Sequence, residues 1–303
     1  MAAHGMKPYL AGVGFATIFG FSFLFAKEAL DYVDPLRLLA FRFALAALVM
    51  TALTLTGVCK VNLWGKDLRP LFRVALLQPV AYFVSETVGL RFVTSSQAGM
   101  MIALIPILVA IFSALFLKEK TTLPQWAFIL LSVSGVAVIV FMQQVSEGGA
   151  SLIGLLLLFC AVTAAAMFNI VSRHATGKFS PFEITFFMMW MGALVFNAMA
   201  ALSHFFAGTL ADYGAVLLYP DVWMGILYLG LLSSVVAFLL VNYSLSKIPA
   251  SQSAVFANVG TVVAVMAGVG LRAEPFYWYS GLGVIMILTG VWGANYFGAT
   301  KPK

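Results

Sequence analysis

The chain is a succession of long apolar runs separated by short polar breaks that carry proline, glycine or charged residues. A helix that crosses a membrane needs about 20 mostly apolar residues, because the hydrocarbon core is about 30 Å thick. By this measure the pattern predicts ten membrane-spanning helices, at Pro8–Leu30, Leu36–Thr56, Leu71–Leu90, Ser96–Leu117, Pro124–Met142, Leu152–Val171, Pro181–Phe206, Val222–Leu245, Ser251–Leu271 and Phe276–Phe297.

The composition agrees with an all-α integral membrane protein and disfavours other classes. Of the 303 residues, 62% are hydrophobic and 9% are charged, whereas soluble domains average about 25% charged residues. The lysines and arginines stand singly between apolar runs, so no nucleic-acid surface is predicted. Cys59 and Cys160 do not form a disulfide framework or a metal site. The expected partners are the lipid bilayer and a small-molecule substrate, with no cofactor, and the chain is expected to be a monomer or a homodimer.

The basic residues predict the orientation in the membrane. With the N-terminus inside, most of the 17 lysines and arginines fall at inner helix ends. Only four fall outside, namely Lys27, Arg37, Arg91 and Arg272, and Arg42 lies within the second segment. Because basic residues favour the cytoplasmic side, we expect a protein of the cell (cytoplasmic) membrane with both termini in the cytoplasm.

The two halves of the chain repeat. Residues 95–136 align with residues 250–291 without a gap, at a constant offset of 155, and this alignment pairs Gln97 with Gln252 and Glu119 with Glu274. A second offset, of 146, pairs Lys27 with Arg173, Pro35 with Pro181 and Phe41 with Phe187. Five helices in each half would insert in opposite orientations, because five is odd. The prediction is two inverted five-helix repeats, residues 1–147 and 148–303, a design that recurs in secondary transporters.

Glu86 is an acidic residue placed well inside an apolar segment. At 1.5 Å per residue, its depth matches that of Arg42 on the preceding predicted helix. The pair can be a salt bridge that locks the fold, or Glu86 can be a cavity carboxylate that attracts a cation or carries a proton. A position at the headgroup level is a third reading. Gln78, Tyr82 and Glu86 lie on one helical stripe, which favours contact with water, although polar residues also join membrane helices.

Other polar residues within the segments are weaker candidates for the same cavity. They are Ser22, Asn169, Asn258 and Thr261, and hydrogen bonds within or between helices explain each of them equally well. Pro106 frees a backbone carbonyl and permits a hinge near mid-membrane. Glu119 and Glu274 end equivalent helices on opposite sides, where each can cap a neighbour or form part of a gate.

Several motifs resemble those of one transporter family. The first group is residues 89–98 (GLRFVTSSQA), Ile105-Pro106, residues 116–120 (FLKEK) and Gly135-Val136. The second is residues 19–23 (FGFSF) with Lys27, Pro35 and residues 41–43 (FRF). Together they resemble the EamA-type branch of the drug/metabolite transporter superfamily across the whole chain. The resemblance implies a ten-helix basket around a central cavity and transport, often outward, of amino acids, other metabolites or drugs. Thr261 stands where the first half has Pro106, so the two halves are not expected to bend alike.

The function predicted on these grounds is secondary transport, by alternating access, of a small organic metabolite such as an amino acid or a similar zwitterionic or cationic compound, with export as the expected direction. The sequence contains no Gly-x-x-x-x-Gly-Lys-Ser/Thr phosphate loop. The alternatives are an intramembrane enzyme and a passive channel. His4, His174 and His204 lie at the N-terminus or at segment ends without catalytic neighbours, and no filter-like glycine run is present, so both alternatives are weaker.

Overall fold

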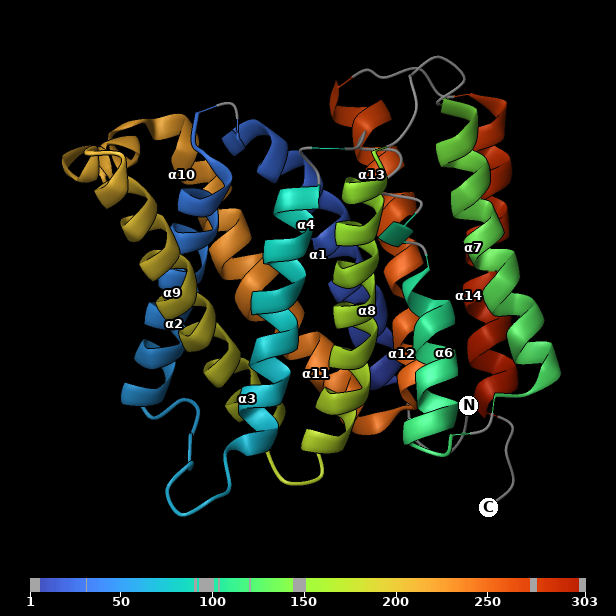
Figure 1. Cartoon of the computed structure of the whole chain (residues 1–303). Coiled ribbons are helices and arrows are strands. Elements are labelled where there is room, and N and C mark those ends of the chain that lie inside the picture. Colours follow the sequence, from blue (N-terminus) through green and yellow to red (C-terminus); the bar gives the residue numbers. More distant parts are fainter. Residues whose placement is uncertain are drawn as a thin grey trace.

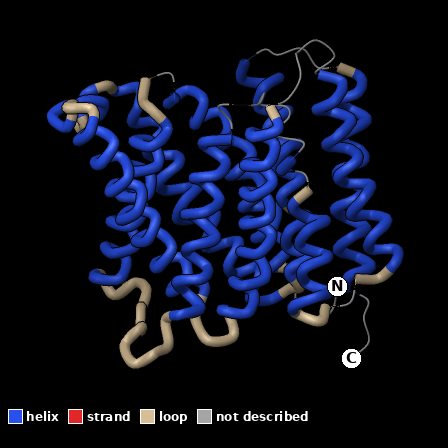
Figure 2. Tube along the Cα trace, viewed as in Figure 1, coloured by secondary structure: helices blue, strands red, loops and turns tan. Residues whose placement is uncertain are grey.

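The computed structural model describes residues 6–30, 32–89, 92, 101–102, 104–119, 121–143, 151–272 and 277–299, and within these residues it is helical and has no strands (Figures 1 and 2). Five of the described helices are long and apolar enough to cross a membrane, at Pro35–Leu55, Leu152–Ala175, Pro181–Phe206, Val222–Lys247 and Trp278–Gly298. Ile105–Phe116 and Leu123–Val138 are shorter apolar helices. The class predicted from the hydrophobic pattern, an all-α membrane protein, is therefore confirmed.

Helices coincide with the predicted segments wherever those segments are described. In the first half they are α1 (Lys7–Leu30), α2 (Pro35–Leu55), α3 (Arg69–Ala75), η1 (Leu76–Ala81), α4 (Tyr82–Gly89), α6 (Ile105–Phe116) and α7 (Leu123–Gln143). In the second half they are α8 (Leu152–Ala175), α9 (Pro181–Phe206), η2 (Leu210–Asp212), η3 (Ala215–Leu218), α10 (Pro220–Leu227), η4 (Tyr228–Val236), α11 (Ala237–Lys247), α12 (Ala250–Val255), α13 (Ala257–Arg272) and α14 (Trp278–Ala299).

Two helices start with the same local chemistry at positions that the 146-residue offset relates. Asp34 caps α2 by accepting a hydrogen bond from the Arg37 backbone N–H, and Pro35 opens the helix. Ser180 caps α9 by accepting from the Glu183 backbone N–H, and Pro181 opens that helix. Proline suits a first turn because the N–H it lacks would have no partner within the helix.

Two π-helical segments interrupt helices at positions related by the 155-residue offset. In the first half, η1 joins α3 to α4 and contains Pro79, with Gln78 in a non-helical conformation. In the second half, η4 joins α10 to α11 and contains Gly230 but no proline. Residues 76–81 correspond to 231–236, which lie within η4. The wider turn of a π segment is an irregularity that recurs at functional sites.

The sequence predicts that the two halves do not bend alike, and the described residues show a helix interruption in each half. Helix α6 begins at Ile105, so Pro106 lies in its first turn, directly after a turn at Leu104. The second half is interrupted without a proline, at Phe256 between α12 and α13. The ring of Phe256 occupies the space beside Gly12 of α1, where a Cβ would lie 2.5 Å from it. Aromatic packing therefore accompanies this break.

Helix pairs from the two halves pack side by side and run in opposite directions. Along α2 and α9, Asp34 lies near His204, Ala40 near Asn197 and Thr51 near Trp190. Along α7 and α14, Gly135 lies against Gly283 and Ser132 against Gly290, and these glycines let the two backbones approach closely. Figure 1 shows α2 and α9 at one edge of the bundle and α7 and α14 at the other.

The helices between these edges also contact one another across the halves. Helix α1 packs on α11 and α13, and helix α8 packs on α4 and α6. The start of α1, the start of α7, the start of α12 and the end of α14 meet at one end of the bundle, as the contacts of Tyr9, Gln125, Gln252 and Gly298 indicate. This is the end that the sequence predicts to be cytoplasmic.

Candidate functional site

Arg42 is a buried cation in the apolar interior of the bundle. Its side chain lies on α2, and the residue is only 7% exposed. Its Nε atom donates to Ser234 Oγ at 2.8 Å, and Nη2 donates to Ser233 Oγ at 3.0 Å. Both serines belong to η4, and Gly230 allows that segment to approach α2, because a Cβ there would lie 3.1 Å from the Arg42 carbonyl oxygen.

Two aromatic rings complete the surroundings of the guanidinium. Its carbon atom lies 4.9 Å from the centre of the Phe83 ring and 5.2 Å from the centre of the Phe43 ring. A cation over an aromatic face is stabilised by the ring quadrupole, more strongly where water is excluded. Among the described residues, hydroxyl groups and rings hold Arg42, and no carboxylate lies within ion-pair distance.

Glu86 lies on α4, half-buried, and its contacts differ from the predicted salt bridge. Tyr82, one turn earlier, donates from Oη to Glu86 Oε1 at 2.8 Å. The ion pairs of the described residues do not include Arg42 and Glu86, although the two charges are near enough to interact electrostatically. Serine hydroxyls accept from two of the five N–H donors of Arg42, and Tyr82 donates to one oxygen of Glu86, so each group keeps further capacity for hydrogen bonds. The arrangement is two adjacent polar groups that carry opposite charges, and we call it the Arg42–Glu86 cluster.

The other predicted cavity residues mostly bond within or between helices. Ser22 donates to the Phe19 carbonyl and Asn169 to the Ala165 carbonyl, each in its own helix. Asn258 is buried and donates to Ser132 on α7 at 3.0 Å, which ties α13 to α7. Gln78 and Thr261 are half-buried. The lining of the two described cavities includes none of the predicted cavity residues.

The structure shows a buried hydroxyl and amide network that sequence reasoning missed. Ser172 on α8 donates to Asn242 Oδ1 at 2.6 Å, and Asn242 Nδ2 on α11 donates to Thr185 Oγ1 on α9 at 2.9 Å. All three residues are fully buried. Each is one of several polar residues in a mostly apolar segment, and the sequence does not reveal that these three side chains meet.

Glu119, predicted as a gate or cap, joins several helix ends. Its Oε2 atom accepts from the Ala250 backbone N–H at the start of α12, at 3.1 Å. Its Oε1 atom lies 3.6 Å from Nε of Arg173 near the end of α8. Arg173 in turn donates to the Leu245 carbonyl on α11 at 2.6 Å. We call Glu119, Arg173 and these two backbone groups the Glu119 clasp. Glu274, its predicted counterpart, lies outside the described residues.

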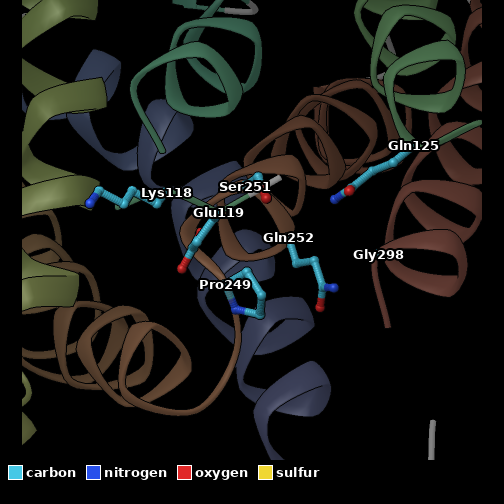
Figure 3. Close-up of a pocket in the computed structure, with 7 residues that line it drawn as sticks. All are labelled: Lys118, Glu119, Gln125, Pro249, Ser251, Gln252 and Gly298. Carbon is cyan, nitrogen blue, oxygen red and sulfur yellow. The ribbon is translucent and has the colours of Figure 1, made fainter. Parts of the chain in front are cut away.

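A cavity of about 330 Å³ lies beside the Glu119 clasp, and its lining residues are Lys118, Glu119, Gln125, Pro249, Ser251, Gln252 and Gly298 (Figure 3). The turn after α6, the starts of α7 and α12 and the end of α14 form it. A second space of about 500 Å³ lies between α1 and α13 and is lined almost entirely by apolar side chains. Of these two cavities, the first is the one lined by charged and amide side chains.

The long apolar helices define a multi-pass membrane protein. The buried Arg42 marks a candidate functional site, since a charge inside a membrane bundle is rare and associated with function. The comparison with family models agrees. The model of the EamA-like transporter family matches residues 6–141 and residues 152–296. The chain belongs to this family, as the sequence motifs predicted.

Individual relatives are similar over nearly the whole chain. Uncharacterized transporter YcxC of Bacillus subtilis (strain 168) is 38% identical over 296 residues, which cover 97% of this chain and 95% of that protein. An uncharacterized transporter of Archaeoglobus fulgidus is 28% identical over 288 residues, covering 95% and 98% respectively. A protein of known crystal structure superposes with a TM-score of 0.78 at 18% identity, over 95% of this chain and 96% of that one, so it shares the fold.

Proposed function

We propose that the chain is a secondary transporter that exports a small organic metabolite, zwitterionic or cationic, by alternating access between two inverted five-helix repeats. The observation that carries the proposal is the antiparallel packing of equivalent helices. Helices α2 and α9 occupy corresponding places in the two halves, and so do α7 and α14, and each pair runs in opposite directions. Inverted repeats give two nearly equivalent packings, which allow a central site to face either side in turn.

Further features support the same proposal. The family model matches each half of the chain separately. The caps at Asp34 and Ser180, and the π segments η1 and η4, recur at the two sequence offsets. The contacts of α1 with α11 and α13 have counterparts in those of α8 with α4 and α6. Chance similarity between apolar runs does not account for agreement in caps, irregularities and contacts together.

The Arg42–Glu86 cluster is the proposed substrate site. Arg42 has hydroxyl and ring partners, so its charge is available to a carboxylate, and the Glu86 carboxylate is available to an ammonium group or a proton. The other residues that we propose to line the substrate cavity are Tyr82, Gln78, Ser22, Asn169, Asn258 and Thr261. The chemistry suits a zwitterion, because an anionic and a cationic group would each find an opposite charge.

The Glu119 clasp is the proposed inner gate, and Pro106 lies at the proposed hinge. The clasp connects α6, α8, α11 and α12 at one end of the bundle, so opening that end requires its contacts to break. Glu274 is proposed as the outer counterpart, with Lys27 related by the repeat to Arg173. In this proposal the two gates close in alternation.

Spin labels can test alternating access before the substrate is known. Cysteines replace exposed Lys118 and Lys178 at the inner end, in a background with Cys59→Ser and Cys160→Ser, and distances are measured in reconstituted protein. We expect a short distance in the closed state and a second, longer population that increases in Arg173→Gln. A single unchanged distance in both proteins would contradict the proposed gate and favour a static channel.

The same cysteine background tests the proposed orientation in the cytoplasmic membrane. A cysteine at Lys66 lies in the loop between α2 and α3, which the positive-inside rule places in the cytoplasm. We expect an impermeant maleimide to label it in inverted vesicles but not in intact cells. Labelling in intact cells would reverse the proposed topology.

Transport is then measured with metabolites that stabilise the purified protein, because a ligand that binds the folded state raises its stability by mass action. Glu86→Gln keeps the volume of the side chain and removes its charge. We expect this variant to fold and to lose transport or its dependence on pH. Full transport by well-folded Glu86→Gln protein would exclude a role for the carboxylate.

A further inference from the structure

The cavity beside the Glu119 clasp is bordered by two buried amide side chains whose hydrogen-bonding capacity is largely unused. Gln125, in the first turn of α7, is 2% exposed, and Gln252, in α12, is 1% exposed. Among the described residues, no partner bonds the Gln125 amide, and Gln252 accepts a single long hydrogen bond of 3.4 Å from Tyr9 Oη. Among the described residues, the fully buried side-chain atoms without a partner are Thr121 Oγ1, Thr163 Oγ1 and Asn295 Oδ1, so the two glutamine amides keep access to the cavity that they line. A ligand or bound water in that cavity can satisfy them, because an unmet buried polar group costs free energy.

The two amide nitrogens face the same small volume, next to Gly298. A Cβ on Gly298 would lie 2.4 Å from Gln252 Nε2 and 2.8 Å from Gln125 Nε2. Each primary amide nitrogen carries two N–H donors. Donors that converge in this way suit an acceptor group with two oxygen atoms, and hydrogen bonds to an ionised acceptor are the strong ones. A glycine at 298 leaves room for the two amide nitrogens, which occupy the place that a Cβ would take.

The charges around the cavity also favour an anion. Lys118 is exposed at the rim, and Figure 3 shows its side chain extending away from the two glutamines. Glu119 carries the opposite charge, but Arg173 lies 3.6 Å from it and offsets that charge. Among the described residues, one positive charge therefore remains at the cavity. Its volume of about 330 Å³ is within the range of about 300–1,000 Å³ typical of small-molecule sites.

We propose that this cavity is a second binding site, which holds the carboxylate of a small metabolite between the amides of Gln125 and Gln252. The Ser251 hydroxyl, on the same wall, faces the remainder of the ligand. The site is separate from the Arg42–Glu86 cluster and does not depend on the proposed transport function. Glu119 lines the same cavity and also holds Ala250 and Arg173, so the site adjoins the Glu119 clasp.

The first experiment uses L-lactate as the probe and the full chain purified in detergent. Its melting temperature is measured with sodium L-lactate, with 1,2-propanediol, which replaces the carboxylate by an alcohol, and with sodium chloride at equal ionic strength. We expect a saturable increase with lactate alone. An increase of the same size with propanediol or sodium chloride, or no saturable increase with lactate, would overturn the proposal.

Variants then locate the binding site. Gln125→Leu keeps a similar volume and removes the amide donors, and Gly298→Ala places a methyl group between the two nitrogens. We expect each to weaken the apparent affinity for lactate by about tenfold or more, because a hydrogen bond to a charged group is lost. Gly214→Ala is the matched control, since a Cβ there meets nothing within 4 Å.

The outcomes separate this site from the proposed transport site. If Gly298→Ala unfolds the protein, Gln125→Leu still decides the question. A lactate response that is unchanged in Gln125→Leu but lost in Arg42→Lys would place the carboxylate at the Arg42–Glu86 cluster and overturn the proposal. Loss of transport in Glu86→Gln leaves the lactate response unchanged if the two sites are distinct.

Discussion

The two ends of the α2–α9 pair have the same design but opposite charges. At one end, Asp34 caps α2, and Arg37 three residues later donates to the Asp212 carbonyl in the loop that follows α9. At the other end, Ser180 caps α9, and Glu183 three residues later accepts from the Asn62 backbone N–H and from Lys66 in the loop that follows α2. Each helix start therefore anchors the loop that leaves its partner.

The difference between the ends lies in how much the anchoring residue is buried. The Glu183 carboxylate accepts three hydrogen bonds, from the Ser180 N–H, the Asn62 N–H and the Lys66 ammonium group. Only 5% of the residue is exposed. Asp34 is 41% exposed at its side chain, so water reaches its ion pair with Arg37 and its 3.9 Å contact with His204 Nε2. Removal of a buried carboxylate that has several donors costs more stability than removal of one partner of an exposed pair, because the donors are left unpaired away from water. The Glu183 end should therefore be the more sensitive to mutation.

The largest effect is expected for Glu183→Ala. The substitution removes the acceptor for two backbone N–H groups and leaves Lys66 without its 2.7 Å partner. Loss of one member of such a buried pair costs about 3 kcal/mol. Thermal unfolding in detergent measures the change. Glu183→Gln is the matched variant, which keeps one carbonyl oxygen and should lose less, and equal losses in both variants would show that the charge alone matters.

A smaller effect is expected at the other end, for Asp34→Ala. Loss of an N-cap side chain typically costs about 1 kcal/mol, and here the loss also frees Arg37 and removes the charge near His204. Asp34→Asn keeps an oxygen that can cap α2 and should be less destabilised. If Asp34→Ala cost more than Glu183→Ala, burial would not be what separates the two ends.

Much of this fold was predictable from the sequence, because the membrane imposes helices of defined length and apolarity. The starts of α2 at Pro35 and α9 at Pro181 lie within one residue of the predicted segments Leu36–Thr56 and Pro181–Phe206, since capping and proline chemistry are local. The family was predicted from motifs that span the chain. The π geometry of η1 and η4 was not predicted, because the hydrophobic pattern marks the length of a segment and not its local hydrogen-bond pattern.

The candidate site was predictable as a set of residues but not as a set of contacts. Arg42 and Glu86 were identified from their depth, yet depth does not show that Ser233 and Ser234 lie nearer to the guanidinium. Glu119 was identified from the repeat, and its partner Arg173 was missed because the pairing needs the positions of two helix ends. Gln125 and Gln252 converge only where α7, α12 and α14 meet.

A still smaller effect is expected for Arg37→Met, which removes the loop contact and the side-chain pair with Asp34 but leaves the Asp34 cap of α2 in place. The methionine keeps much of the length of the side chain but removes the 3.3 Å hydrogen bond to the Asp212 carbonyl and the pair with Asp34. Such exposed contacts are worth about 0.5 kcal/mol. Asp212→Ala is the control, since the contact uses the backbone carbonyl and should survive. Comparable losses in both variants would indicate that the Asp212 side chain matters instead.

The smallest expected effect is a dependence of stability on pH at the Asp34 end. Burial acts to raise the pKa of Asp34, but the hydrogen bonds from Arg37 and the charges of Arg37 and His204 outweigh burial and lower the pKa below its ordinary value of 3.8. A carboxyl group whose pKa is lower in the folded state stabilises the fold fully above the unfolded value. That contribution is lost as the pH falls through the folded value. Wild type should therefore exceed Asp34→Asn in melting temperature at neutral pH, and the difference should shrink as the pH falls below 3.8.

The effect of pH should be small, because water screens a side chain that is 41% exposed. A difference that stays constant with pH would assign the role of Asp34 to capping, and the contrast between the two ends would then rest on geometry and not on charge.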